Sequence, residues 1–343
     1  MILHMNLPQN GYDIILERGS LKRAGELLNL NRRVLIVTDT GVPALYAQTL
    51  AAQCANPVIE TVPTGEGSKS FAVLEQLCRV MMEHHFTRSD CVVAVGGGVV
   101  GDLAGFTAAS YMRGVDFYNC PTTVLSQVDS SIGGKVAINL DHVKNIVGAF
   151  YQPKRVLIDP DVLSTLPARQ ISNGLAEAVK MSLTSDAELF AIFEDRNAIE
   201  RIDTVIERAL RIKKAVVEED EKEAGLRRIL NFGHTLGHGV EAQNDRNHLY
   251  HGECVALGML PMCAEEVRAR LLPVLESLAL PTRIEDEMEL VLDAASHDKK
   301  CKGQSISVVY VPRVGEFEIR TLPIEAWKHE IRNTVIDSGK EST

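Results

Sequence analysis

The sequence has no excess of basic residues. Its 343 residues include 36 Lys and Arg against 46 Asp and Glu, which gives a formal net charge of -10 at pH 7. A chain of this charge lacks the general positive field that attracts nucleic acid or an anionic membrane surface. We therefore predict no nucleic-acid partner and no membrane partner, and any anionic ligand must be bound by a local group of Lys and Arg side chains.

The sequence also lacks paired cysteines, long apolar runs and an N-terminal targeting pattern. The seven cysteines are scattered, and none stands in a Cys-x-x-Cys pair, as expected for reduced thiols in the cytosol. Cys254 stands close to His251, but we interpret it as a small buried apolar residue rather than a ligand. No apolar segment reaches the length of a membrane span. These absences predict a soluble cytoplasmic protein.

The first half of the chain alternates short β-branched runs with helical patterns. A chain of this length usually forms more than one core, and we expect two domains, residues 1–166 and 167–343. The alternation predicts an α/β fold of Rossmann type, with a mostly parallel sheet and ligands at the carboxyl ends of its strands. The predicted strands are residues 33–37, 57–62, 91–95, 116–120 and 155–158, and the predicted helices are residues 43–54 and 71–85.

A glycine-rich turn, residues 96–101, follows the third predicted strand. It fits Gly-x-Gly-x-x-Gly between a strand and a helix, where backbone N-H groups can hold a pyrophosphate. A plain tight turn is the alternative, because the motif does not follow the first strand. Two other strand ends favour nucleotide binding: Asp39 is a suitable acceptor for ribose hydroxyls, and Lys69 can lie beside a phosphate.

A second polar pocket is predicted from residues 121–135. Paired glycines precede Lys135, and Asp129 and Asn145 are polar neighbours in the sequence. A solvated glycine loop is the alternative interpretation.

Beyond Pro167 the pattern changes to long amphipathic helices, which predicts a mainly helical second domain. Glu177 and Lys180 stand three residues apart and share one helix face. A surface ion pair is the ordinary interpretation, but Ala, Val and Met surround them, so Glu177 is a candidate metal ligand. The predicted helices are residues 173–184, 186–194, 199–217 and 258–271, followed by short strands at 306–311 and 317–321 and a last helix.

Four of the ten histidines stand within eighteen residues. If the apolar spacing around them is helical, His234 and His238 lie four apart on one face. Gly233 and Gly237 cost helical stability, which suggests that something approaches this backbone closely. Imidazole suits Zn²⁺, and a catalytic zinc usually has three protein ligands and one open position. One His of the pair, together with His251, is therefore a candidate ligand.

Seven segments, in this order, resemble the 3-dehydroquinate synthase family, and the resemblance runs from about residue 12 to residue 330. The motifs are Gly96-Gly-Gly-Val-Val-Gly-Asp102, Tyr111-Met-Arg-Gly114, Gln127-Val-Asp-Ser-Ser-Ile-Gly-Gly-Lys135, Lys144-Asn-x-x-Gly-Ala-Phe-Tyr-Gln-Pro153, Ala176-Glu-x-x-Lys180, Asn231-Phe-Gly-His-x-x-Gly-His238 and His251-Gly-Glu253. Members of this family have an N-terminal NAD-binding α/β domain, a C-terminal helical domain, an active site in the cleft and one catalytic zinc.

The resemblance implies a set of functional residues, carried over motif by motif. The implied zinc ligands are Glu177, His234 and His251, with cobalt or another divalent metal as an alternative to zinc. The implied NAD-binding residues are Asp39, Glu66, Lys69, Gly97, Gly98, Asp102, Thr122, Thr123, Lys144 and Thr165. The implied substrate-binding residues are Arg113, Asp129, Lys135, Asn145, Lys180, Lys213, Arg227, Asn231, His238 and one of Lys299 and Lys300. The implied catalytic residues are Lys135, Lys180, Glu223 and His238, with Glu223 as a proton acceptor.

The implied reaction converts 3-deoxy-D-arabino-heptulosonate 7-phosphate to 3-dehydroquinate and phosphate, in the shikimate pathway to aromatic amino acids. NAD removes a hydride and later returns it; phosphate leaves by elimination, and an aldol step closes the carbocycle. The substrate carries a carboxylate and a phosphate, which Arg and Lys side chains can neutralise. The chain departs from the usual family pattern at Lys222, in place of Arg, and at Val136, in place of Thr. The first change keeps Glu223, and the second removes a hydroxyl beside the substrate pocket.

Other functions compete with this interpretation. Another sugar phosphate cyclase would share the mechanism, and a metal-dependent polyol dehydrogenase of similar build would release NADH. A non-catalytic nucleotide-binding metal protein would release no phosphate. Family members are commonly homodimers, so the resemblance also implies a homodimer.

Overall fold

A computed structural model gives the fold for residues 1–141, 143–223, 225–296, 301–302 and 304–338. The chain divides into two compact units. The first unit comprises Met1–Pro167 and Lys213–Lys222, and the second comprises Ala168–Ile212 and Glu223–Thr343. The short segment that returns to the first unit contains the end of one long helix, and the amphipathic pattern of that helix gives no signal for the change of unit.

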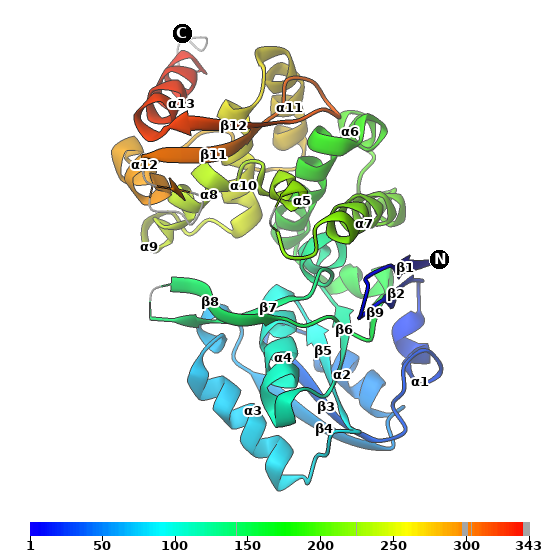
Figure 1. Ribbon diagram of the computed structural model, residues 1–343. Helices are drawn as coiled ribbons and strands as arrows, with labels where there is room; N and C mark the ends of the chain where they lie inside the picture. Colours follow the sequence, from blue (N-terminus) through cyan, green and yellow to red (C-terminus); the bar gives the residue numbers. More distant parts are fainter. Residues whose placement is uncertain (142, 224, 297–300, 303, 339–343) are drawn as a thin grey trace. The chain divides into compact units, whose positions relative to one another are not determined.

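The first unit contains a seven-stranded sheet with the strand order β1-β2-β9-β6-β5-β3-β4 (Figure 1). Strands β1 and β2 are antiparallel, and the other neighbouring pairs are parallel. The strands are β1 (Ile2–Met5), β2 (Tyr12–Leu16), β3 (Arg33–Asp39), β4 (Asn56–Val62), β5 (Cys91–Gly96), β6 (Asp116–Pro121) and β9 (Arg155–Ile158). The five strands predicted from the sequence are therefore confirmed.

Successive residues of the central strands enter two separate hydrophobic clusters. In β3, Val34 and Ile36 join a cluster with residues of α1 and α2, whereas Leu35 and Val37 join a cluster with residues of α3 and α4. A strand buried on both faces reads as a continuous apolar run, which is typical of parallel sheets covered by helices. The predicted Rossmann-like fold is confirmed. The helices are α1 (Ala24–Leu27), α2 (Ala44–Ala51), α3 (Phe71–Glu83) and α4 (Gly98–Ser110).

A hairpin of strands β7 (Lys135–Leu140) and β8 (Val143–Phe150) forms a second sheet in the first unit. It follows a π-helical turn, Ser126–Ser130. The sequence predicted a polar pocket here and no strands, because most side chains of β8 are exposed and its residues do not alternate clearly. Val136 points from the hairpin toward α4, where a Cβ on Gly105 would lie 2.4 Å from its Cγ1. The glycine therefore makes room for the valine.

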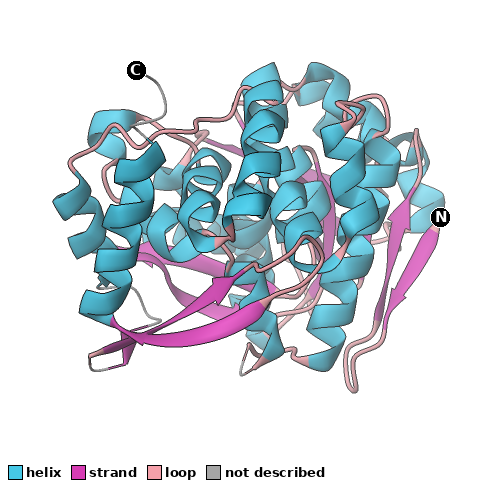
Figure 2. Cartoon of the chain, turned by 90° about the horizontal axis from the view of Figure 1, so that it is seen from above, coloured by secondary structure: helices cyan, strands magenta, loops and turns pink. Residues whose placement is uncertain are grey.

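The second unit consists mainly of helices, with a three-stranded antiparallel sheet (Figures 1 and 2). Its helices are α5 (Ala168–Ser185), α6 (Ala187–Glu194), α7 (Ile202–Glu219), η6 (Leu226–Asn231), α8 (His234–Glu241), α9 (Asn244–Asn247), α10 (His251–Met259), η7 (Leu260–Met262), α11 (Glu265–Ser277), α12 (Met288–Ser296) and α13 (Ile324–Ser338). Its strands are β10 (Cys301–Lys302), β11 (Ser305–Tyr310) and β12 (Glu318–Pro323). Among the described residues, no helix combines the length and apolar character that crossing a membrane requires.

The helix predicted over residues 258–271 is wrong. Helix α10 ends at Met259, a short 3-10 turn containing Pro261 follows, and α11 begins only at Glu265. Proline has no N-H for a helical hydrogen bond and its ring clashes with the preceding turn. The backbone instead becomes extended at Cys263, which bridges to Val311 beside the three-stranded sheet.

Helices α8 and α10 touch backbone to backbone at glycines. A Cβ on Gly258 would lie 1.9 Å from the carbonyl oxygen of Gly233, and a Cβ on Gly237 would lie 2.9 Å from that of Cys254. These distances are below van der Waals contact, so the two helices pack closely only because these positions lack a side chain. The partner that approaches Gly233 and Gly237 is thus helix α10.

We predict that Gly258→Ala destabilises the second unit, because its Cβ meets a backbone atom that cannot rotate away. Overpacking of this kind costs about 3 kcal/mol, which corresponds to a Tm lowered by about 6 °C or more. Gly67→Ala is the control, since that glycine is exposed and a Cβ at this position would have no neighbour within 4 Å. Calorimetry showing the same Tm for both variants would contradict the close packing.

Candidate metal centre and active site

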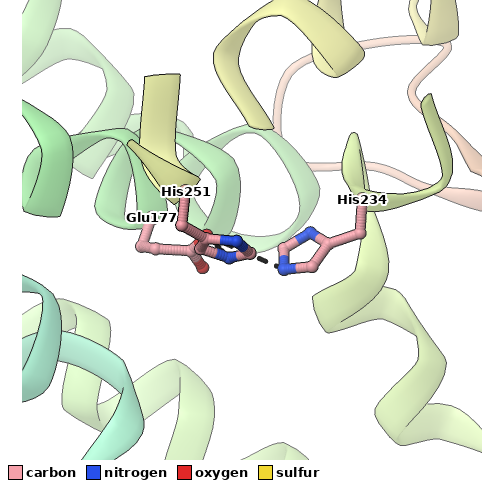
Figure 3. A group of neighbouring side chains, drawn as sticks. All are labelled: Glu177, His234 and His251. Atoms are coloured by element: carbon pink, nitrogen blue, oxygen red, sulfur yellow. Dashed lines mark ion pairs between the residues drawn. The ribbon is translucent and has the colours of Figure 1, made fainter. Parts of the chain in front are cut away.

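Three side chains from three helices of the second unit converge on one point. Glu177 comes from the middle of α5, His234 is the first residue of α8 and His251 is the first residue of α10. Their side chains are directed toward one another (Figure 3). Oε1 of Glu177 lies 3.8 Å from Nε2 of His234 and 3.6 Å from Nε2 of His251. One atom from each residue therefore faces a common position.

The charge and spacing of this group fit a divalent metal ion. The side chain of Glu177 is fully buried, and its Oε1 atom has no hydrogen-bond partner. Its Oε2 atom accepts a hydrogen bond from Lys180, which is also buried. A buried carboxylate oxygen without a partner is costly. Two ligands of a tetrahedral zinc are about 3.4 Å apart, close to the observed spacing, so the residues present fit zinc.

The ion pairs of the group set its protonation. Burial opposes the charge of Glu177, but Lys180 and His251 outweigh it and lower the pKa of Glu177 to about 2. Burial also opposes a charged His251, yet its contacts with Glu177 and Glu241 raise the pKa of His251 to about 10. Without metal the imidazole of His251 is therefore protonated at neutral pH. A metal ion that enters must displace this proton, because a ligating imidazole is neutral.

The turn before α8 places His234 at the start of the helix, next to Glu177. Gly233 has a positive φ of 75°, a conformation that glycine adopts readily, and it places His234 at the start of the helix. Nδ1 of His234 lies 3.1 Å from the carbonyl oxygen of Phe232, and Nε2 is the ring nitrogen that lies near Glu177. The His238 ring lies 5.4 Å from the His234 ring between centroids. His238 instead belongs to a second possible metal group, with Glu241 and His251.

Helix α5 holds the start of α10 through residues spaced four apart. Arg169 donates two hydrogen bonds to Glu253, at 2.7 and 2.8 Å. Asn173, one turn later, accepts a hydrogen bond of 2.7 Å from the backbone N-H of Gly252. Glu177 follows after one more turn, so one face of α5 both contacts the start of α10 and carries the candidate ligand. Arg169 and Asn173 were not predicted from the sequence, although their spacing of eight and four residues before Glu177 places them on the same helix face.

Other predicted substrate and catalytic residues of the second unit lie on the short helix η6 and near it. Arg227 is buried at 2% exposure. Asn231 donates a hydrogen bond of 2.8 Å to Glu223, whose backbone has a positive φ of 62°. The structure thus pairs two residues that the sequence placed in the same site. Lys299 and Lys300 lie outside the described residues.

The predicted NAD-binding residues of the first unit follow the carboxyl ends of neighbouring parallel strands. Strand β3 ends at Asp39, and the loop after β4 carries Glu66 and Lys69. Gly97 and Gly98 follow β5, Thr122 and Thr123 follow β6, and Thr165 lies in the turn after β9. Because these strands are parallel, their carboxyl ends share one edge of the sheet, where α/β folds bind nucleotides. The backbone of Gly97 precedes the first turn of α4, where its N-terminus can face an anion.

Lys69 is the centre of a polar network at this edge. Its buried ammonium group lies 2.6 Å from Asp102 and 3.5 Å from Glu66, and it donates to Asn145. Glu66 accepts a hydrogen bond of 3.0 Å from Asn139, which links the loop after β4 to the β7–β8 hairpin. The network brings together Lys69, Asp102 and Glu66, which the family resemblance implies for NAD, and Asn145, which it implies for the substrate. Lys144, beside Asn145 on β8, is exposed.

A second polar group of the first unit includes Asp129 and Lys213. Nζ of Lys213 lies 2.6 Å from the carboxylate of Asp129 and 2.5 Å from its backbone oxygen. Lys213 comes from the end of α7, so this pair ties the returning segment to the first unit. Arg113 and Lys135 are both exposed, and Arg113 has a positive φ of 68°.

Models of the 3-dehydroquinate synthase family match two consecutive parts of the chain. The model of the N-terminal part matches residues 59–173, and that of the C-terminal part matches residues 174–301. A curated relative, the 3-dehydroquinate synthase of Streptococcus thermophilus, is 40% identical over 346 residues, covering 94% of this chain and 98% of that protein.

Solved structures of sugar phosphate cyclases have the same fold. The 2-epi-5-epi-valiolone synthase of Streptomyces hygroscopicus, solved with NAD⁺ and Zn²⁺ bound, superposes with a TM-score of 0.88 at 27% identity, covering 98% of this chain and 99% of that one. A 2-deoxy-scyllo-inosose synthase complexed with carbaglucose-6-phosphate, NAD⁺ and Co²⁺ gives a TM-score of 0.88 at 23% identity, covering 97% and 100%. The second likeness is evidence for the fold alone.

We predict that His251→Ala removes the metal whereas His238→Ala retains it. The first variant leaves Glu177 and His234 as two ligands, too few to hold zinc tightly, and its metal content after dialysis should fall below about 0.1 per chain. The second variant leaves the Glu177 group intact. Elemental analysis of both proteins measures this directly, and loss of metal from His238→Ala would place the ion in the second group instead.

Proposed function

The chain belongs to the 3-dehydroquinate synthase family, and on that premise we propose that it converts 3-deoxy-D-arabino-heptulosonate 7-phosphate to 3-dehydroquinate and phosphate. The observation that carries the proposal is the 40% identity to a curated 3-dehydroquinate synthase over nearly the whole of both chains. The buried Glu177 group, which fits zinc, supports it from the geometry. We propose NAD and zinc as cofactors, since a related cyclase was solved with both bound.

We propose that the first unit binds NAD and that the second unit binds the metal. The carboxyl edge of the first sheet binds NAD through the residues that follow β3, β4, β5, β6 and β9. Glu177, His234 and His251 of the second unit hold the metal. Bound zinc would acidify substrate hydroxyls, and NAD would take up a hydride and return it.

The acid-base groups that we propose are Lys180, His238 and Glu223. Lys180 balances the charge of Glu177 in a buried site and, with His238, is placed near the ligands to bind or move a substrate proton. Asn231 orients the carboxylate of Glu223 through their hydrogen bond, which suits Glu223 to accept a proton. Lys135, Arg113, Lys213 and Asp129 of the first unit are the proposed contacts to the polar groups of the substrate, together with Asn145.

Arg227 is the residue that we propose for the second anion of the substrate. The family resemblance assigns Arg227 to the substrate, and its planar guanidinium can pair with a carboxylate through two parallel hydrogen bonds. The heptulosonate phosphate carries a carboxylate in addition to its phosphate. A site with Arg227 thus favours that sugar over one with a neutral head group.

We also propose a homodimer in the cytoplasm. The homodimer rests on the family resemblance, and light scattering at two protein concentrations would test it. A reducing compartment is supported by six described cysteines that are free thiols. Fractionation of cells that produce the protein would test the location.

We predict that the protein releases inorganic phosphate from the heptulosonate phosphate and requires NAD without consuming it. Phosphate should accumulate in large excess over enzyme-bound NAD, with no parallel rise in NADH absorbance, because the hydride returns within each turnover. His251→Ala is the control that should release none. A rise in NADH equal to product would indicate a polyol dehydrogenase instead.

We predict a preference for the heptulosonate phosphate over sedoheptulose 7-phosphate, which lacks the carboxylate. The difference in transition-state binding should be at least ~3 kcal/mol, a hundredfold in kcat/KM. Arg227→Ala should lose more activity with the carboxylate substrate than with the neutral one. Measuring both sugars on the same preparation cancels any loss of folded protein, and comparable kcat/KM values for the two would exclude the dehydroquinate assignment while leaving a cyclase mechanism open.

A further inference from the structure

The hydrogen-bond partner of Nδ1 of His251 is the carboxylate of Glu241. Oε2 of Glu241 lies 3.2 Å from Nδ1 of His251, and the Glu241 side chain is 18% exposed. The opposite ring nitrogen, Nε2, is the one that faces Glu177 at 3.6 Å. One imidazole therefore connects the candidate metal position with a second carboxylate.

Glu241 lies where helix stability alone would not place it. It is the last residue of α8, and a carboxylate at a helix C-terminus interacts unfavourably with the helix macrodipole. It follows His234, the first residue of the same helix, by seven residues, so both lie on one face. Helix α8 thus carries one metal ligand at its start and a partner for another ligand at its end.

We propose that Glu241 is a positioning residue for the metal centre. It accepts the proton of Nδ1 of His251, which fixes the tautomer with its lone pair on Nε2 and holds the ring toward Glu177. An anionic acceptor also makes the ligating nitrogen a stronger donor than a neutral one does. His234 has a neutral partner at the corresponding nitrogen, the carbonyl oxygen of Phe232, so Glu241 makes His251 the stronger of the two imidazole ligands.

The alternative is that Glu241 is itself a ligand, with His238 and His251. His251 would then use Nδ1, and the carboxylate of Glu177 would lack the metal. Glu177 is fully buried with an unpartnered oxygen, whereas the three residues of the second group are only partly buried. A cation therefore relieves a larger cost at Glu177 than at Glu241. This favours a metal at Glu177, with Glu241 as the hydrogen-bond partner of His251.

The test measures metal binding by the whole chain without substrate or NAD, so its outcome does not depend on the proposed reaction. Zinc affinity is measured by competition with a chelator for Glu241→Ala and Glu241→Gln. The alanine variant should bind zinc about 10- to 100-fold more weakly, and the glutamine variant, which keeps a neutral acceptor, should lie between it and the parent. Glu194→Gln is the matched control, because Glu194 pairs with Arg270 at the surface of the same unit and should leave the affinity unchanged.

Two further readouts separate positioning from other roles. The visible spectrum of the cobalt-loaded Glu241→Ala protein should keep the band shape of the parent, since the ligands are unchanged. The far-UV circular dichroism of the metal-free variant at room temperature should match that of the parent, which excludes general loss of structure. An unchanged zinc affinity in Glu241→Ala would overturn the proposal. Metal content near zero in both Glu241 variants, or a changed band shape in a variant that retains cobalt, would overturn it in favour of Glu241 as a ligand.

Discussion

The second unit depends on the buried carboxylate of Glu177. A charge buried away from water is costly unless it is paired with an opposite charge and hydrogen-bonded. Lys180 supplies one from the same helix, and its side chain is buried with that of Glu177. The other oxygen has no hydrogen-bond donor and faces two imidazoles at 3.6 and 3.8 Å. This is an arrangement that a divalent cation completes and that the protein groups alone leave incomplete.

The imidazoles of His234 and His251 reach the carboxylate of Glu177 only if helices α8 and α10 pack closely against each other and against α5. Glycines make that possible: a Cβ on Gly252 would lie 1.9 Å from the backbone oxygen of Asn173, and one on Gly258 equally close to that of Gly233. Contacts between backbones leave no flexible side chain to absorb a shift. The hydrogen bond from Gly252 to Asn173 and the pairing of Arg169 with Glu253 then fix the direction from which His251 enters. The three candidate ligands are positioned by their helices, and the carboxylate of Glu241 lies 3.2 Å from the ring of one of them, His251.

Residue patterns predicted correctly those elements that are buried in the same way along their whole length. The run at residues 33–37 is apolar because β3 is buried on both faces, and the pair Glu177 and Lys180 was recognisable among small apolar neighbours. Residue patterns left open whether His234 or His238 is the ligand, because both share a helix face. In the structure His234 lies in a group with Glu177 and His251, and His238 lies in a group with Glu241 and His251. The β7–β8 hairpin was not predicted because its second strand is largely exposed. The helix predicted over residues 258–271 was wrong because Pro261 interrupts it. Glu241 resembles any surface acid at a helix end until its contact with His251 is visible.

The location of the metal is measured most directly by anomalous diffraction at the zinc absorption edge, from crystals of the zinc-loaded protein. We expect one peak per chain, within bonding distance of a Glu177 oxygen and of Nε2 of both His234 and His251, with Glu241 hydrogen-bonded to Nδ1 of His251. A peak bound to His238, Glu241 and Nδ1 of His251, with Glu177 unliganded, would contradict this expectation.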